Sequence, residues 1–151
     1  MKMKDNAIWL DECAVGDAYV SGTYEVTEEE IIAFAKQYDP QYFHTDPEKA
    51  KDSFFKGLAS SGWLTAGIMM KLQVASNPFG FDLVGVEVKL EWPSPTRAGD
   101  ILHIRTEIKD IKMSRSKPNQ GILTVETITK NQKDEVRMVM QNKILGFTRP
   151  K

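Results

Sequence analysis

Residues 62–76 read G-W-L-T-A-G-I-M-M-K-L-Q-V-A-S, and this stretch decides the fold that the sequence predicts. It leaves almost no polar face, which is typical of a helix buried in a core. The helix ends at Asn77-Pro78, because proline disfavours helical geometry in the residue before it. Such a helix must pack against another layer, which the rest of the chain has to supply.

The chain after this helix is predicted to supply that layer as a sheet. Apolar and polar residues alternate there, which predicts strands with one apolar face. The alternating groups are Val84, Val86, Val88, Leu90 and Trp92; Leu102, Ile104, Thr106 and Ile108; Leu123, Val125 and Thr127; and a last strand from about Val136 to Leu145. Turn-forming segments at 93–100, 114–121 and 131–134 separate them, so we expect an antiparallel meander of consecutive strands. An antiparallel sheet wrapped around a long buried helix is the α+β architecture called the hotdog fold.

The segment before the long helix is predicted to be mainly helical. Thr27 and Glu30 form a capping-box pair for a helix over about residues 28–37. This helix stops at the Asp39-Pro40 turn. Asp46-Pro47 has the pattern of an N-cap with proline at the first helical position, and it predicts a short helix through about Asp52.

Length, charge and cysteine usage exclude several classes of protein. The 151 residues are 41% hydrophobic and contain no repeat or linker, so we expect a single domain over residues 1–151. The 20 basic and 21 acidic residues leave a net charge of -1, which argues against nucleic acid as a partner.

Cys13 is the only cysteine, which excludes an internal disulfide. With just His44 and His103 to join it, the chain has too few soft ligands for a zinc site, so we expect no metal and a reducing, cytoplasmic location. There is no run of about 18 apolar residues and no signal-peptide segment, so we expect no contact with membranes.

The stretch D-P-Q-Y-F-H-T, from Asp39 to Thr45, carries the clearest chemistry. It places a carboxylate and an imidazole in one proline-containing loop. Together these groups can hold a water molecule between a proton acceptor and a proton donor, as the addition of water to an activated double bond requires. The alternative is a helix-ending turn with a surface histidine, because Asp-Pro is common in turns.

Three motifs resemble MaoC-like dehydratases and (R)-specific enoyl-CoA hydratases. They are D-P-Q-Y-F-H-T-D-P-E-K-A at 39–50, F-F-K-G-L-A-S-S-G-W-L-T-A at 54–66 and E-W-P-S-P-T-R-A-G-D at 91–100. The resemblance implies a lyase of fatty acid metabolism that adds water to, or removes it from, a trans-2-enoyl thioester carried on CoA or an acyl carrier. It implies that Asp39 and His44 are the catalytic pair, that coenzyme A enters only as part of the substrate, and that the protein forms a homodimer or a higher homo-oligomer with the acyl site near the subunit interface.

Gly62 is the candidate donor to the thioester oxygen, which becomes negative during the reaction. It stands where the long helix begins, so its N-H points out of the positive end of the helix dipole, and the missing side chain allows a carbonyl to approach. The resemblance puts the oxyanion contact at the same glycine. The alternative is a glycine that serves only as a hinge between loop and helix.

Several further residues are candidates for substrate binding. Trp63, Phe54, Phe55, Met69 and Met70 could line an acyl tunnel, although core packing is the simpler role for most of them. Arg115, in the basic segment S-R-S-K at 114–117 with Lys109 and Lys112 nearby, could bind the phosphates of coenzyme A, or lie in an ordinary solvated loop. His103 alternates with Leu102 and Ile104 and is expected to face solvent or an interface, without a chemical role.

The chain departs from the family pattern around the proposed pair. Members commonly carry Asn-Pro where this chain has Gln41-Tyr42, and many carry histidine at the position of Ser61. Some have a serine in the long helix where this chain has Met70. Ser61 and Met70 therefore remain candidate substrate contacts of unknown character.

Two other functions remain open. A hotdog acyl-thioesterase would direct water at the carbonyl carbon, but many of these enzymes carry Asp or Glu on the central helix, and residues 62–77 contain neither. A non-catalytic subunit that binds acyl thioesters would keep the fold without turnover. The presence of both Asp39 and His44 argues against it.

Overall fold

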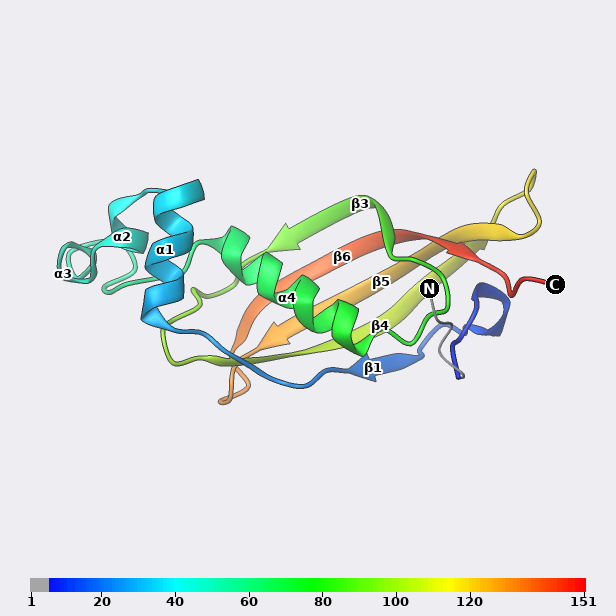
Figure 1. Ribbon diagram of the computed structural model, residues 1–151, viewed down its shortest axis with the longest axis horizontal. Coiled ribbons are helices and arrows are strands. Elements are labelled where there is room, and N and C mark those ends of the chain that lie inside the picture. Colours follow the sequence, from blue (N-terminus) through cyan, green and yellow to red (C-terminus); the bar gives the residue numbers. More distant parts are fainter. Residues whose placement is uncertain (1–5) are drawn as a thin grey trace.

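The computed structural model describes residues 6–151. Long antiparallel strands form a sheet, one helix lies across its face, and the helices of residues 28–50 gather at one end (Figure 1). The elements in chain order are η1 (Leu10–Glu12), β1 (Ala18–Val20), β2 (Tyr24–Glu25), α1 (Glu28–Tyr38), α2 (Tyr42–Thr45), α3 (Pro47–Ala50), α4 (Gly62–Ser76), β3 (Val84–Glu91), β4 (Ile101–Met113), β5 (Gln120–Lys130) and β6 (Val136–Phe147).

Helix α4 has the bounds that the sequence predicts, and its inner face forms the main core. Leu64, Ile68, Met69 and Leu72 pack with side chains of the sheet and of α1, namely Leu102, Ile104, Met138, Met140 and Ile31. The expectation of a fully buried helix is wrong. Trp63, Met70 and Val74 on its outer face are 62%, 38% and 56% exposed, because the sheet of one chain covers only one side of the helix.

The strands follow the order β1-β4-β5-β6-β3, with β2 also pairing with β4. Strands β4, β5 and β6 form the meander that the turns predict. The expectation that β3 lies next to β4 is wrong, since β3 pairs with β6 and becomes an edge strand. Alternation of apolar residues reveals that a strand exists, but an antiparallel partner on either side satisfies it equally well.

A β-bulge between Gly85 and Glu87 divides β3 into two parts that face differently. Val84 pairs with Leu145, whereas Val88 and Leu90 pair with Asn142 and Met140, which point to the opposite face of β6. The prediction that the alternating residues of 84–92 share one face is therefore wrong. A bulge adds one residue and reverses the alternation beyond it.

The helical segment before α4 largely follows the sequence. Thr27 caps α1 by accepting from the Glu30 N-H at 3.2 Å, and the Glu30 carboxylate accepts from the Tyr24 hydroxyl at 2.6 Å. This hydrogen bond, with burial and the charge of Glu30, raises the pKa of Tyr24 to about 12. Asp46 caps α3 as expected, but α3 ends at Ala50, before the predicted residue 52.

Several elements were not predicted, namely α2, β1, β2 and a second core at the opposite end of the sheet. In that core Trp9 and Leu10 pack with Phe79, Phe81 and residues of β4, β5 and β6. Within residues 6–151, no helix has both the length and the apolar character needed to cross a membrane.

Candidate active site

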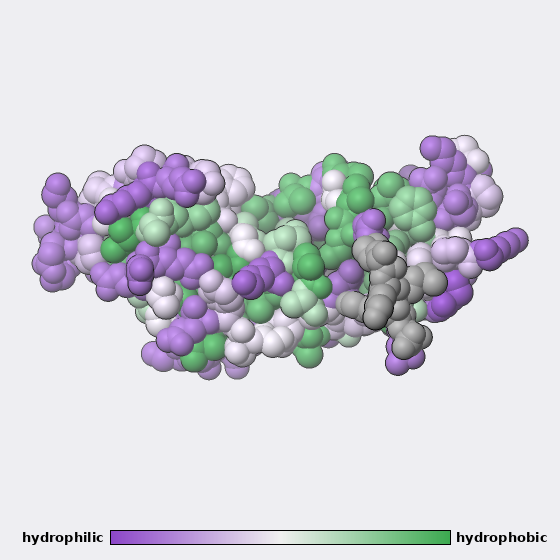
Figure 2. Space-filling view, viewed as in Figure 1, coloured by the Kyte–Doolittle hydropathy of each residue, from purple (hydrophilic) through white to green (hydrophobic). Residues whose placement is uncertain are grey.

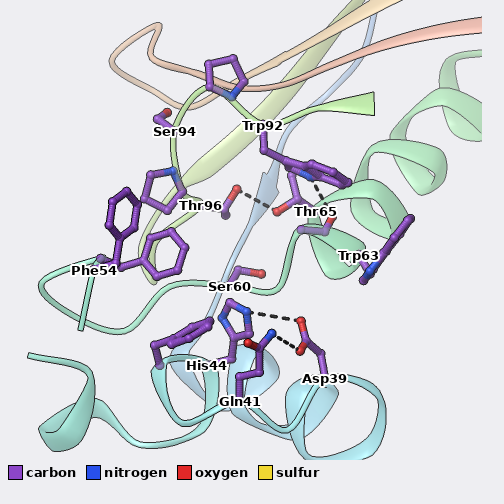
Figure 3. Close-up of a pocket in the computed structure, with 15 residues that line it drawn as sticks. Asp39, Gln41, His44, Phe54, Ser60, Trp63, Thr65, Trp92, Ser94 and Thr96 are labelled. Carbon is purple, nitrogen blue, oxygen red and sulfur yellow. Dashed lines mark hydrogen bonds and ion pairs between the residues drawn. The ribbon is translucent and has the colours of Figure 1, made fainter. Parts of the chain in front are cut away.

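The side chains of Asp39 and His44 point toward each other at the end of α1 (Figure 3). Asp39 is the C-cap residue of α1, and His44 lies in the short helix α2 that follows. Pro40 separates the two helices and turns the chain, so that His44 Nε2 comes to 3.3 Å from Asp39 Oδ2. The two residues that the sequence singled out are therefore neighbours in space.

His44 is 5% exposed and is oriented by a backbone carbonyl. Its Nδ1 lies 2.6 Å from the oxygen of Ala59. Since a carbonyl can only accept a hydrogen bond, Nδ1 carries a proton, and Nε2 is the ring nitrogen that faces Asp39. The Asp39 carboxylate and His44 Nε2 are thus close enough to contact the same water molecule.

Asp39 is held in its ionised form. Burial raises the pKa of its carboxyl, but hydrogen bonds from Gln41 and Ser61 and the neighbouring His44 outweigh this effect and bring the pKa below its ordinary value. The Gln41 amide donates to Asp39 Oδ1 at 2.7 Å. Positions 41 and 61, two of those that depart from the family pattern, thus both contact the carboxylate.

Gly62 begins α4, and its surroundings admit no larger residue. A Cβ at this position would lie 2.6 Å from Cε2 of Trp92, whose indole N-H donates to the Gly62 carbonyl at 3.1 Å. Ser61 is the N-cap of α4 and accepts from the Trp63 N-H at 3.3 Å. Among residues 6–151 no acceptor takes the Gly62 N-H, so this donor remains available at the positive end of the helix.

A cavity of about 520 Å³ opens beside these groups. Its walls combine apolar and polar side chains. The apolar ones are Phe43, Phe54, Phe55, Trp63, Trp92, Pro93 and Pro95, and the polar ones are Asp39, Gln41, His44, Ser60, Thr65, Ser94 and Thr96. An apolar pocket with a few convergent polar groups is the usual form of a small-molecule site.

The predicted substrate contacts divide into two groups. Phe55 and Trp63 line the cavity together with Gly62, while Ser61 is fully buried behind it against Asp39. Met70 lies further along α4 and outside the lining. Arg115 lies in the β4–β5 turn, at the end of the molecule opposite α1 and α2 (Figure 1), so within one chain it cannot reach the cavity.

Sequence reasoning missed a pair of hydroxyl groups in the cavity wall. Thr65 Oγ1 donates to Thr96 Oγ1 at 2.9 Å, and the Ser60 N-H donates to the Thr96 carbonyl at 2.8 Å. Thr65 follows Gly62 on the same helix and could have been inferred from helical geometry. Thr96 comes from the segment before β4, and nothing in the sequence indicates that it meets α4.

The titratable groups of the site do not form a metal centre. In the described part of the chain, no three side chains of the types His, Cys, Asp and Glu lie close enough together to hold an ion. The site thus offers one carboxylate, one imidazole, hydroxyls and a backbone N-H.

Comparison with known proteins agrees with this fold. The family model described as MaoC like domain matches residues 13–131. The chain belongs to the MaoC-like family. A Bacillus subtilis (strain 168) relative, described as uncharacterized protein YdeM, is 35% identical to this MaoC-like chain over 127 residues, which are 83% of this chain and 89% of the relative.

Solved structures extend the MaoC-like assignment to the whole fold. A MaoC-like dehydratase from Rhodospirillum rubrum has a TM-score of 0.94 and 42% identity, covering 96% of this chain and 100% of that one. The (R)-hydratase PhaJ1 of Pseudomonas aeruginosa has a TM-score of 0.72 and 20% identity, covering 95% of this chain and 88% of that one, and it shows a shared fold alone. The hotdog fold and the family expected from the sequence are confirmed, and the chain falls within a hydratase and dehydratase family.

Proposed function

We propose that this protein is a lyase that adds water to the double bond of a trans-2-enoyl thioester, or removes it in the reverse direction. The observation that carries the proposal is the approach of Asp39 and His44 to 3.3 Å beside a cavity that the Gly62 backbone also lines. Family membership supports the same class of reaction.

In the proposed reaction one water molecule donates to both Asp39 and His44 Nε2. As the water oxygen bonds to Cβ of the substrate, Nε2 takes its proton, and the electrons of the double bond move to the thioester oxygen. The imidazolium then gives this proton to Cα, so that the elements of one water are added and the ring returns to its neutral form. Asp39 orients the water and stabilises the imidazolium, and an ionised carboxylate suits this role.

Gly62 supplies the donor for the enolate oxygen in this proposal. Its N-H lies at the start of α4 and has no acceptor among the described residues. One such donor contributes about 3 to 4 kcal/mol of transition-state stabilisation in other enzymes. Phe55 and Trp63 form apolar walls for the acyl group.

A paired assay separates this proposal from the alternatives. Purified protein should deplete the conjugated enoyl absorbance of crotonyl-CoA without releasing free thiol. Release of thiol from a saturated acyl-CoA, without hydration, would establish a thioesterase instead. Binding of acyl-CoA with neither reaction would establish a non-catalytic subunit.

We also propose that the protein acts as a homodimer through β3 and the outer face of α4. Figure 2 shows apolar surface over this region. The exposed apolar side chains are Trp63, Met70, Val74, Val84, Val86 and Val88, and β3 is an edge strand with one side unpaired. An exposed apolar edge strand favours pairing with a second copy.

The charges of β3 favour one register for this pairing. In an antiparallel pair centred on Val88, Glu87 of each copy lies opposite Lys89 of the other. Registers centred on Glu87 or Lys89 would set like charges against each other, which destabilises a strand pair. Trp63 and Trp92 border both this face and the cavity, so the second copy would complete the cavity wall.

The same dimer gives the basic β4–β5 turn a role. Antiparallel pairing of β3 turns one copy end for end relative to the other, which brings this turn toward the partner's cavity. Arg115, Lys112 and Lys117 gather there, and Arg115 makes no ion pair among the described residues. We therefore assign the CoA phosphates to Arg115 of the second copy.

We also propose a reducing, cytoplasmic location, which suits the free thiol of Cys13. Burial and nearby carboxylates raise the pKa of this thiol to about 11.

A further inference from the structure

The guanidinium of Arg97 holds the segment between α3 and α4 by three backbone carbonyls. Nη2 donates to the oxygen of Phe55 at 2.5 Å, and Nη1 donates to the oxygens of Gly57 and Leu58 at 3.0 and 3.1 Å. Arg97 makes no ion pair within the described part of the chain. Its guanidinium therefore serves to hold the backbone of residues 55–58 in place.

This segment leads directly into the site. It carries Phe54 and Phe55, which form one wall of the cavity, and it continues to Ala59, whose carbonyl orients His44. Gly62 follows after the two serines. A shift of the segment would thus move the acyl wall and the acceptor that orients the imidazole.

Few other bonds fix residues 55–58. The Phe55 N-H donates to Ser53 Oγ and the Lys56 N-H donates to the Ser53 carbonyl, which keeps the start of the segment in place. Lys56 has a positive φ of 57°, a conformation that costs free energy for a side chain other than glycine. The carbonyls of Gly57 and Leu58 have no donor other than Arg97 among the described residues.

Arg97 is itself anchored on a buried ion pair. Its backbone N-H donates to Asp100 Oδ2 at 2.8 Å, and Asp100 also accepts from Arg137 Nε at 2.9 Å and from Asn131 Nδ2 at 3.0 Å. The side chains of Asp100 and Arg137 are 6% and 8% exposed. The Arg97 clamp, meaning its guanidinium and the three carbonyls that it binds, is therefore attached to a buried network of Asp100, Arg137 and Asn131.

We propose that Arg97 is a positioning residue that fixes the Phe54–Phe55 wall and thereby sets the size of acyl group that the enzyme accepts. This inference rests on the proposed hydratase function. Arg97 does not line the cavity and touches no reacting atom. It acts through the backbone of residues 55–58, and a planar fork with several donors is needed to reach three carbonyls at once.

The test compares Arg97→Ala and Arg97→Lys with Arg105→Ala. Arg105 is a matched control, because its exposed side chain pairs with Glu107 on β4, away from the cavity. The first measurement is amide hydrogen exchange over residues 53–62. The second is the ratio of kcat/KM for crotonyl-CoA to that for trans-2-octenoyl-CoA.

Arg97→Ala should speed exchange in residues 53–62 and change the substrate ratio by roughly tenfold, chiefly through KM. In both measurements Arg97→Lys should fall between Arg97→Ala and the wild type. If Arg97→Ala does not fold, Arg97→Lys takes its place in the test. Arg105→Ala should match the wild type in both measurements. Unchanged exchange and an unchanged ratio in the Arg97 variants would overturn the proposal, as would faster exchange spread evenly over the chain.

Failure of the hydratase function gives a different result. The wild-type protein would then leave both enoyl substrates unchanged, while exchange at residues 53–62 and the binding of saturated butyryl-CoA and octanoyl-CoA would still report on Arg97. Loss of discrimination between these two ligands in Arg97→Ala would support the clamp without the reaction. Equal discrimination in the variant and the wild type would reject it.

Discussion

The indole N-H of Trp92 donates to the carbonyl oxygen of Gly62 at 3.1 Å, and the ring lies where a Cβ of residue 62 would be. This contact joins the end of β3 to the first turn of α4. It explains why glycine stands at the start of the helix, because the Trp92 ring and a side chain at position 62 cannot occupy the same space.

Gly62→Ala should therefore lower kcat by about 10²-fold to 10³-fold, the contribution of one oxyanion donor. The added Cβ, 2.6 Å from Trp92 Cε2, must displace either the ring or the helix start. Steady-state kinetics with crotonyl-CoA measures the effect. Gly22→Ala is the matched control, since a Cβ there meets nothing within 4 Å, and it should keep the wild-type kcat. Full activity in Gly62→Ala would reject Gly62 as the oxyanion donor.

Phe55→Ala and Met70→Ala should differ in their effect on acyl preference. Phe55 lines the cavity, so its truncation enlarges the acyl wall and should favour longer enoyl-CoA substrates. Met70 lies outside the lining and should leave the relative kcat/KM values unchanged. The measurement is kcat/KM over a series of enoyl-CoA chain lengths. An unchanged series in Phe55→Ala, or a shifted one in Met70→Ala, would place the acyl group elsewhere.

Asp100→Asn should destabilise the fold at neutral pH and flatten its dependence on acid. Burial raises the pKa of Asp100, but hydrogen bonds from Arg137, the Arg97 N-H and Asn131, with the charge of Arg137, bring it below the ordinary value. Because the folded pKa is depressed, this stability is present above the unfolded pKa of about 3.9 and is lost as pH falls through the folded pKa.

Breaking the buried pair of Asp100 and Arg137 should lower the free energy of unfolding by about 3 to 5 kcal/mol at pH 7. Urea unfolding from about pH 3 to about pH 7 measures this loss, because that range extends from below to well above the reference pKa of about 3.9. The difference from the wild type should shrink toward the acid end. Asp110→Asn, at an exposed position of β4, is the control and should unfold like the wild type. A constant difference across the range would contradict the role given to the Asp100 charge.

Val88→Glu should convert the proposed dimer into a monomer. In the proposed register the two copies of residue 88 face each other, so the substitution sets two buried carboxylates together. Sedimentation velocity measures the oligomeric state. Val20→Glu makes the same change on β1, at the other edge of the sheet, where Val20 is 73% exposed, and it should remain dimeric. A wild-type protein that sediments as a monomer would reject the dimer altogether.

Much of the fold could be predicted because local patterns encode it. The bounds of α4 follow from one apolar stretch and a terminating proline, and the start of α1 follows from Thr27 and Glu30. The placement of β3 beside β6 could not be predicted, because the alternation of apolar and polar residues does not indicate which strand lies next to it. The bulge between Gly85 and Glu87 could not be predicted either. One extra residue reverses which face of the sheet the following side chains point to, and the composition of the strand does not reveal it.

The site could be predicted only where its residues are close in sequence. Asp39 and His44 share one loop, and Gly62 marks a helix start, so their spacing carries the signal. Thr96 and Arg97 meet the site from the opposite side of the fold, and only tertiary packing brings them there. Arg115 was predicted to contact the substrate because its side chain suits phosphate binding, but it lies far from the cavity of its own chain.

The hydration of crotonyl-CoA by the wild type, Asp39→Asn, His44→Ala and His103→Ala tests the central claim most directly. His103 contacts the Asn131 carbonyl and serves as the matched histidine control. The wild type and His103→Ala should hydrate at equal rates, while the two site variants should lose about 10²-fold to 10⁴-fold with little change in melting temperature. Hydration at the wild-type rate by both Asp39→Asn and His44→Ala would contradict the account.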